Sequence, residues 1–124
     1  MQSSVNISEE FVEALNEVLE DEFEDIYEAR EMQRRKSTHG SFSTGMKVKF
    51  ACEDCDKRWT SAQGTVIVRF SYSRSDGVIR ARAHVYKQLC KGCDGLGEIS
   101  TYEDEVLSIA NEFLEFLDET VVNP

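Results

Sequence analysis

The chain has 124 residues, of which 24 are acidic and 14 are Lys or Arg, and its formal net charge is −10. This length suits a modest core, so we expect residues 1–124 to form a single domain. The first residues show no basic start or apolar run typical of a secretory signal, and nowhere do 18 apolar residues follow one another. We therefore expect a soluble cytoplasmic protein, with peripheral association with membranes as an alternative.

The charge falls into three blocks. Residues 1–30 hold ten acidic side chains and one basic, residues 31–93 hold thirteen basic and five acidic, and residues 94–124 hold nine acidic and no basic. The middle of the chain is basic and both flanks are acidic. The basic surface of the middle block therefore needs an explanation.

We assign residues 1–33 to an N-terminal helix, of which about twenty residues form an amphipathic stretch. Ser8 is the expected N-cap, and Glu9 and Glu10 favour the positive end of the helix dipole. Apolar residues recur there at three- and four-residue steps, opposite an acidic face. They are Phe11, Leu15, Val18, Leu19, Phe23, Ile26 and Tyr27. We expect this stripe to pack on the domain's own sheet, the alternative being a partner-binding helix.

Residues 34–45 are predicted to form a flexible loop, because small polar residues and two glycines occur there without periodicity. Residues 46–98 then form a β module. Met46 to Phe50 alternates as a strand, and residues 65–72 and 78–86 alternate as a hairpin around a turn at 73–77. The predicted buried faces are Val66, Val68, Phe70 and Tyr72 on one strand and Ile79, Ala81, Ala83 and Val85 on the other.

The opposite face of this hairpin is predicted to be basic. Its candidate partner-binding residues are Arg69, Arg80 and Arg82, joined by Lys47, Lys49 and Lys87. The alternative is that charges on a solvent-facing sheet only protect it from aggregation.

All four cysteines of the chain lie in two CxxC pairs, Cys52 with Cys55 and Cys90 with Cys93. Two cysteines at this spacing present both sulfurs to one tetrahedral metal ion. In a reducing compartment such pairs are metal ligands rather than disulfides. The 34 residues between the pairs must fold back on themselves, as a hairpin does. We predict one structural Zn²⁺ held by all four.

Residues 99–120 are predicted to form a C-terminal helix, capped by Thr101 with Asp104 in a capping-box arrangement. Its apolar stripe is Val106, Leu107, Ala110, Phe113, Leu114 and Leu117. Ile109 and Phe116 broaden that stripe. We expect burial between the sheet and the N-terminal helix, with an exposed strip for a partner or a membrane as the alternative.

Enzymatic chemistry is not indicated. A zinc deaminase needs H-x-E and P-C-x-x-C, but Val85 and Tyr86 follow His84, and Leu89 precedes Cys90. Four thiolates also leave no open coordination position for a catalytic water. We therefore predict a non-enzymatic α+β protein, with a small antiparallel sheet and a four-cysteine zinc site flanked by N-terminal and C-terminal amphipathic helices.

The ordered motifs resemble a known family. Cys52-x-x-Cys55 is followed by Trp59-Thr60-Ser61, by Val66 to Phe70, by Gly77 to Arg82, and by Val85 to Cys90-x-x-Cys93. This order is similar to that of the 3CxxC-type zinc-finger family, and within it most to the receptor-transporting proteins, over about residues 46 to 118.

The resemblance implies a zinc-binding accessory protein that associates with odorant or taste receptors and helps them reach the cell surface. It carries over the ligand roles of Cys52, Cys55, Cys90 and Cys93, and a packing role beside the knuckle for Trp59. The same finger occurs in zygote arrest proteins, where it binds RNA. RNA binding by the basic hairpin face is therefore the rival expectation.

Overall fold

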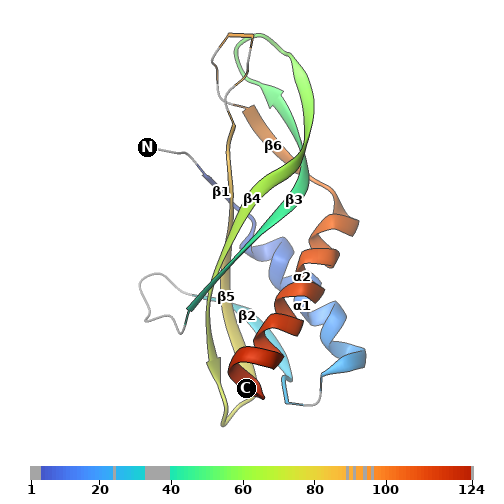
Figure 1. Cartoon of the computed structure of the whole chain (residues 1–124), viewed down its shortest axis with the longest axis vertical. Helices are drawn as coiled ribbons and strands as arrows, with labels where there is room; N and C mark the ends of the chain where they lie inside the picture. The colour runs from blue at the N-terminus through green and yellow to red at the C-terminus, as the bar shows by residue number, and fades with distance from the viewer. Residues whose placement is uncertain are drawn as a thin grey trace.

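The computed structural model describes residues 4–23, 25–32, 40–88, 90, 92–93, 95 and 97–123. Both helices lie on one side of a long twisted sheet, and the sheet extends beyond them at one end (Figure 1). The elements in chain order are β1 (Ser4–Asn6), α1 (Ser8–Glu22), β2 (Glu28–Glu31), β3 (Gly40–Cys52), β4 (Arg58–Ser73), β5 (Val78–Tyr86), β6 (Gly97–Thr101), α2 (Glu103–Leu117) and a π-helical turn η1 (Asp118–Val122).

The sheet confirms the predicted α+β class. Its strand order is β1-β5-β4-β3-β6, and these neighbours are antiparallel, while β2 adds a parallel pairing to β5. The predicted hairpin is β4 and β5, which pair from Val66 opposite Val85 to Ser73 opposite Val78. Its predicted inward residues are all buried. The predicted strand at Met46 to Phe50 is part of β3, which pairs with β4 as expected.

The N-terminal helix is shorter than predicted. Helix α1 ends at Glu22, and the residues assigned to its continuation include β2, which pairs with β5. Ile26 is buried, but Tyr27 is 73% exposed. No end signal is present after Glu22, because the apolar spacing continues and no glycine or proline follows directly. The pairing of β2 with β5 nevertheless takes the later residues out of the helix, so a tertiary contact overrides their local helix preference.

Ser8 is not the N-cap. Helix α1 begins after Ile7 without a side-chain cap among the described residues. The Ser8 hydroxyl instead accepts a hydrogen bond from the Ala83 N–H at 3.0 Å, and the Ile7 N–H donates to the Ala83 carbonyl at 2.9 Å. Strand β5 is thereby covered along its outer edge by β1, by Ser8 and by β2 in turn. A covered edge removes a template for aggregation.

The predicted loop at residues 34–45 is partly strand. Residues 34–39 of this prediction, which include Arg34, Arg35, Lys36 and His39, lie outside the described residues. Gly40 to Gly45 instead belong to β3 and pair with Phe70 to Thr65 of β4. Small polar residues are poor strand formers by themselves, but a long apolar partner strand supplies the pairing that local preference does not.

The core lies between the helices and the inner face of the sheet. Phe113 of α2 is its centre, with ring centroids 5.7 Å from Phe11, 5.6 Å from Phe42 and 5.3 Å from Phe70. The apolar stripes of α1 and α2 both join this cluster. The packing of both helices on the domain's own sheet is thus confirmed, and no membrane-spanning length of apolar helix occurs among the described residues.

Helix α2 begins at Glu103 rather than at residue 99. Thr101 ends β6 and does not cap the helix, which starts after Tyr102 with no side-chain cap in the described part of the chain. Ile109 is 3% exposed and Phe116 packs against the core at half burial. The expected burial of the broad apolar face is therefore confirmed.

One side chain fastens β2 to α1. The Asn16 amide donates to the Ala29 carbonyl at 3.0 Å and accepts from the Ala29 N–H at 2.8 Å. Ala29 is buried, so its backbone N–H and carbonyl depend on the Asn16 amide for these hydrogen bonds. Truncating Asn16 leaves both without that partner.

We predict that Asn16→Ala lowers the free energy of unfolding by about 1–3 kcal/mol, measured by urea denaturation. Glu17→Ala, an exposed neighbour on the same helix, should change it by less than about 0.5 kcal/mol. Equal effects of the two substitutions would contradict the role assigned to Asn16.

Candidate metal centre

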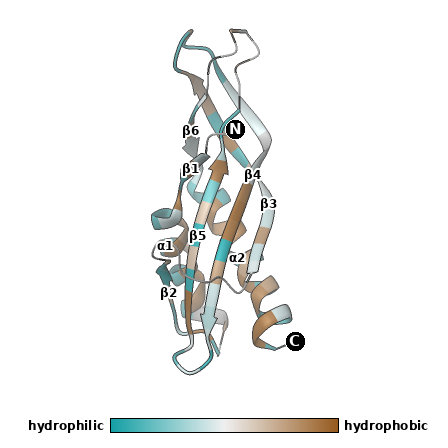
Figure 2. Cartoon of the chain, turned by 90° about the vertical axis from the view of Figure 1, so that its left-hand side faces the viewer, coloured by the Kyte–Doolittle hydropathy of each residue, from teal (hydrophilic) through white to brown (hydrophobic). Residues whose placement is uncertain are grey.

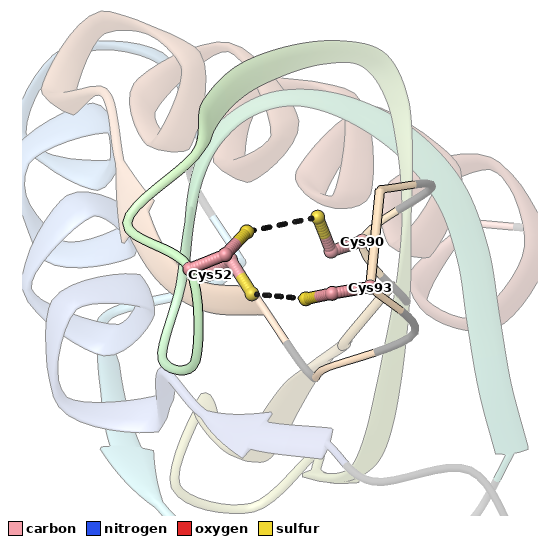
Figure 3. Close-up of side chains that lie close together, drawn as sticks. Cys52, Cys90 and Cys93 are labelled. Atoms are coloured by element: carbon pink, nitrogen blue, oxygen red, sulfur yellow. Dashed lines mark hydrogen bonds between the residues drawn. The ribbon is translucent and has the colours of Figure 1, made fainter.

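The four cysteines converge at the end of the sheet that the helices leave free. Cys52 ends β3, Cys55 follows in the next turn, and Cys90 and Cys93 lie between β5 and β6. Their sulfur atoms all lie within 4.8 Å of one another. Figure 3 shows the labelled side chains of Cys52, Cys90 and Cys93 pointing into one common space. The topology thus brings together two pairs that are far apart in sequence.

Two close sulfur contacts cross from one pair to the other. The Cys52 and Cys93 sulfurs are 3.4 Å apart, and those of Cys55 and Cys90 are 3.7 Å apart. Four sulfurs at about 2.3 Å from a tetrahedral Zn²⁺ lie about 3.8 Å from each other. The spacing therefore fits one zinc ion.

The two CxxC turns have the same backbone closure. The Cys52 N–H donates to the Lys57 carbonyl and the Cys90 N–H donates to the Gly95 carbonyl, each at 2.7 Å and each five residues on. In the first turn Asp56 takes a left-handed conformation with φ of 59°. Two equivalent knuckles thus face each other, each with a buried cysteine, Cys52 or Cys90, and an exposed one, Cys55 or Cys93.

The second knuckle packs tightly on the first through Gly95. A Cβ at Gly95 would lie 3.0 Å from the Cys52 sulfur and would overlap the Asp54 carboxylate. At Gly92 a Cβ would be 3.7 Å from the Cys90 sulfur and 4.0 Å from the Lys57 Nζ, which is ordinary contact. A side chain at Gly95 would therefore displace the Asp54 carboxylate and crowd the Cys52 sulfur, whereas one at Gly92 would make ordinary contacts.

The pKa values of Cys90 and Cys93 are shifted in opposite directions. The pKa of Cys90 is lowered to about 7, chiefly by the backbone N–H of Gly92, and further by the Cys93 N–H and two neighbouring thiols. The pKa of Cys93 is raised to about 12, because the thiols of Cys52, Cys55 and Cys90 together with burial outweigh the N–H of Gly95. A metal ion that binds all four sulfurs must displace these shared protons.

An aromatic pair lies directly beside the knuckles. The rings of Phe50 and Trp59 stack at a centroid distance of 5.2 Å and an interplanar angle of 13°. A Cβ at Gly97, where the second knuckle enters β6, would lie 2.8 Å from the Trp59 ring and 2.9 Å from the Phe50 ring. The expected packing role of Trp59 is therefore seen, and the rings hold β6 close to β3.

The comparison with protein families identifies this arrangement. A zinc-binding domain family, the 3CxxC zinc ribbon, matches residues 45–123. The chain belongs to the 3CxxC zinc-ribbon family of zinc-binding domains. No curated protein and no solved structure matched the chain.

The donor set of this 3CxxC domain suits one structural Zn²⁺. Cys52, Cys55, Cys90 and Cys93 would hold it, and four thiolates complete a tetrahedral shell. When bound, zinc crosslinks the two knuckles. The cluster with its ion carries a charge of −2, and Lys57 lies alongside the second knuckle, while Lys87 pairs with Glu53 at 3.7 Å.

The remaining candidate residues do not join the metal site. Figure 2 looks onto the sheet face that the helices leave uncovered, where β4 and β5 carry hydrophilic patches. Arg69 and Arg82 face each other across β4 and β5, and Arg80 lies two residues from Arg82. Burial first, and then Arg82 and Arg69, lower the pKa of His84, which lies beside them. Their role in partner binding stays a prediction.

Lys47 and Lys49 lie on β3, where both ammonium groups sit over the Tyr102 ring, 5.3 Å and 4.6 Å from its centroid. No motif in the sequence singles out Tyr102, Gly95 or Gly97. Glycines after a CxxC pair indicate that the knuckle packs closely, but only the fold shows at which glycine an added side chain would not fit.

We predict that Gly95→Ala weakens zinc binding about tenfold or more, because the new methyl group forces the Cys52 sulfur and the Asp54 carboxylate to move. Competition with a chromophoric chelator measures the affinity. Gly92→Ala is the matched control and should bind zinc as the wild type does. Equal loss in both variants would contradict the close contact at Gly95.

We further predict one zinc ion per chain, measured by elemental analysis of purified protein, and its loss in Cys90→Ser. The loss should lower the melting temperature, because metal binding and folding of this end are coupled. His84→Ala should keep its zinc. Zinc retained in Cys90→Ser would mean that another residue completes the coordination shell.

Proposed function

We propose that this 3CxxC domain is a non-enzymatic accessory protein of the receptor-transporting type, which binds a chemosensory G-protein-coupled receptor and assists its trafficking to the membrane. The observation that supports this proposal most is the separation of charge between the two faces of the domain. The sheet face is basic, while helices α1 and α2 on the other face carry no Lys or Arg.

The basic face suits a membrane surface. Arg69 and Arg82 are directly opposite each other, an arrangement of like charges that costs stability in a sheet. Within the described part of the chain, neither has an acidic partner within 4.0 Å. The cytoplasmic leaflet is anionic and attracts each Lys or Arg at its surface by about 1 kcal/mol.

The helical face suits the cytoplasmic segments of a receptor. A hollow of about 270 Å³ lies between α1 and α2, with Ala14, Val106 and Leu107 among its lining and four glutamates around it. These are Glu10, Glu13, Glu17 and Glu103. Cytoplasmic loops of membrane proteins carry an excess of Lys and Arg, so apolar and basic receptor segments are complementary to this hollow.

The absence of catalysis is also part of the proposal. The four cysteines are the one group of possible metal ligands found among the described residues. With four thiolates on zinc, no coordination position remains for substrate or water. The ion then has a structural role, and the domain acts by binding.

We predict that a chemosensory receptor solubilised in detergent co-precipitates with the wild-type chain but not with Glu13→Gln/Glu17→Gln. The reason is the loss of two charges from the hollow. Glu115→Gln/Glu119→Gln removes the same charge from exposed positions outside it and should leave co-precipitation unchanged. Arg80→Glu/Arg82→Glu should also leave it unchanged, because no membrane is present. Loss of the receptor in the sheet variant alone would contradict the proposal.

RNA binding is the second candidate, and the facing Arg69 and Arg82 favour it, because guanidinium groups bind phosphates in a bidentate manner. Tyr86 lies further along the same face of β5 and offers a ring for base stacking. Electrophoretic mobility of single-stranded RNA at physiological salt tests this candidate. A shift that Arg80→Glu/Arg82→Glu abolishes would support it, and the absence of any shift with the wild type would exclude it.

A further inference from the structure

A pocket outside the metal centre lies at the zinc end, where Lys49, Thr60 and Ser100 share the outer sheet face. It has a volume of about 400 Å³ and is lined by two cations, Lys49 and Arg58, and two hydroxyl groups, Thr60 and Ser100, together with aromatic and small residues between them. The volume falls within the range of small-molecule sites. Of these four polar residues, only Thr60 belongs to the motifs that point to the zinc-finger family, and none is a zinc ligand.

Strand register explains why the four residues meet. Lys49 of β3 lies between Thr60 of β4 and Ser100 of β6, each its direct cross-strand partner. Neighbouring strands are about 4.8 Å apart, so the two hydroxyl groups flank the lysine on either side. Arg58 is two residues from Thr60 and therefore points to the same face.

Tyr102 positions the lysine and one hydroxyl. Its ring lies under the Lys49 ammonium at 4.6 Å from the centroid, and its hydroxyl is 3.5 Å from the Thr60 Oγ1. A cation held over an aromatic ring keeps its hydrogen-bond donors free for a further ligand.

The positive charge of the pocket is not neutralised within the described residues. No carboxylate there lies within 4.0 Å of Lys49 or Arg58. By register, Glu98 lies diagonally across from Lys49, about 7–8 Å away, and two strands from Arg58. The Glu105 carboxylate accepts the Lys47 N–H at 3.0 Å instead of pairing with either pocket cation. The pocket thus offers two unpaired cations and two hydroxyl donors to an anion.

We propose that this pocket binds a phosphate monoester, as presented by the phosphorylated headgroup of an anionic lipid. Two cations match the two charges of a phosphate monoester, and the planar guanidinium of Arg58 can donate two parallel hydrogen bonds to its oxygens. The volume leaves space for the group that carries the phosphate. A lipid is favoured as its source, because Arg69, Arg80 and Arg82 lie further along the same face of the sheet and would add attraction to an anionic membrane surface.

Zinc holds this pocket together. Strand β3 ends at Cys52, β4 begins at Arg58 directly after the first knuckle, and β6 begins at Gly97 directly after the second. All three strands that supply the polar groups are therefore anchored at the metal. Binding of the headgroup should depend on zinc, whereas the proposal does not depend on the chain's binding a receptor.

Co-sedimentation of the zinc-loaded full chain with vesicles tests the site. Phosphatidylcholine vesicles containing phosphatidylinositol bisphosphate should bind more tightly than vesicles of equal charge made with phosphatidylserine. Calorimetry with inositol trisphosphate tests the soluble ester. Binding of inositol trisphosphate without a preference among vesicles would retain the phosphate chemistry and overturn the lipid source. Binding of neither probe would overturn the whole proposal.

Neighbouring substitutions provide the control. Arg58→Met should weaken binding of inositol trisphosphate about tenfold or more, and Ser100→Ala on another strand should weaken it too. Arg69→Met removes the same charge from the same sheet face, outside the pocket and away from the knuckles, and should have less than a twofold effect on inositol trisphosphate. Equal weakening by Arg58→Met and Arg69→Met, with zinc content unchanged, would show that general charge attraction and not the pocket is responsible. Preference for single-stranded RNA over inositol trisphosphate would contradict the ligand class.

Discussion

The crosslink of four sulfurs through one zinc ion is the interaction on which this end of the molecule depends. The helices and the phenylalanine cluster around Phe113 stabilise the other end, where α1 and α2 cover the sheet. Among the described residues, no helix covers the strands at the zinc end. A small domain supplements a limited core with a metal site, and here the metal site lies where the core ends.

The crosslink also determines which strands can meet. The first knuckle joins β3 to β4 and the second leads from β5 into β6. Zinc holds the second knuckle against the first. Strand β6 follows the second knuckle and therefore lies at the free edge of β3, where it pairs from Thr101 opposite Val48 to Gly97 opposite Cys52. The rings of Phe50 and Trp59 stack on each other, and Gly97, which has no side chain, allows them to pack closely against the start of β6.

The sequence predicted the parts of this fold that have a short-range signal. Alternation of apolar residues located the hairpin of β4 and β5 and its buried face, and the two CxxC pairs located the metal centre. It did not predict β1 and β2, because strands of three and four residues depend on the edge of β5 for pairing. The pocket of Lys49, Arg58, Thr60 and Ser100 also required the register of three strands, which no local pattern specifies.

X-ray absorption spectroscopy at the zinc edge of the purified chain shows which atoms coordinate the ion. Four sulfur ligands at about 2.3 Å are expected, with no nitrogen or oxygen in the coordination shell. A shell with fewer than four sulfurs, or with a nitrogen or oxygen ligand in place of one, would contradict the four-cysteine crosslink and the account of the fold built on it.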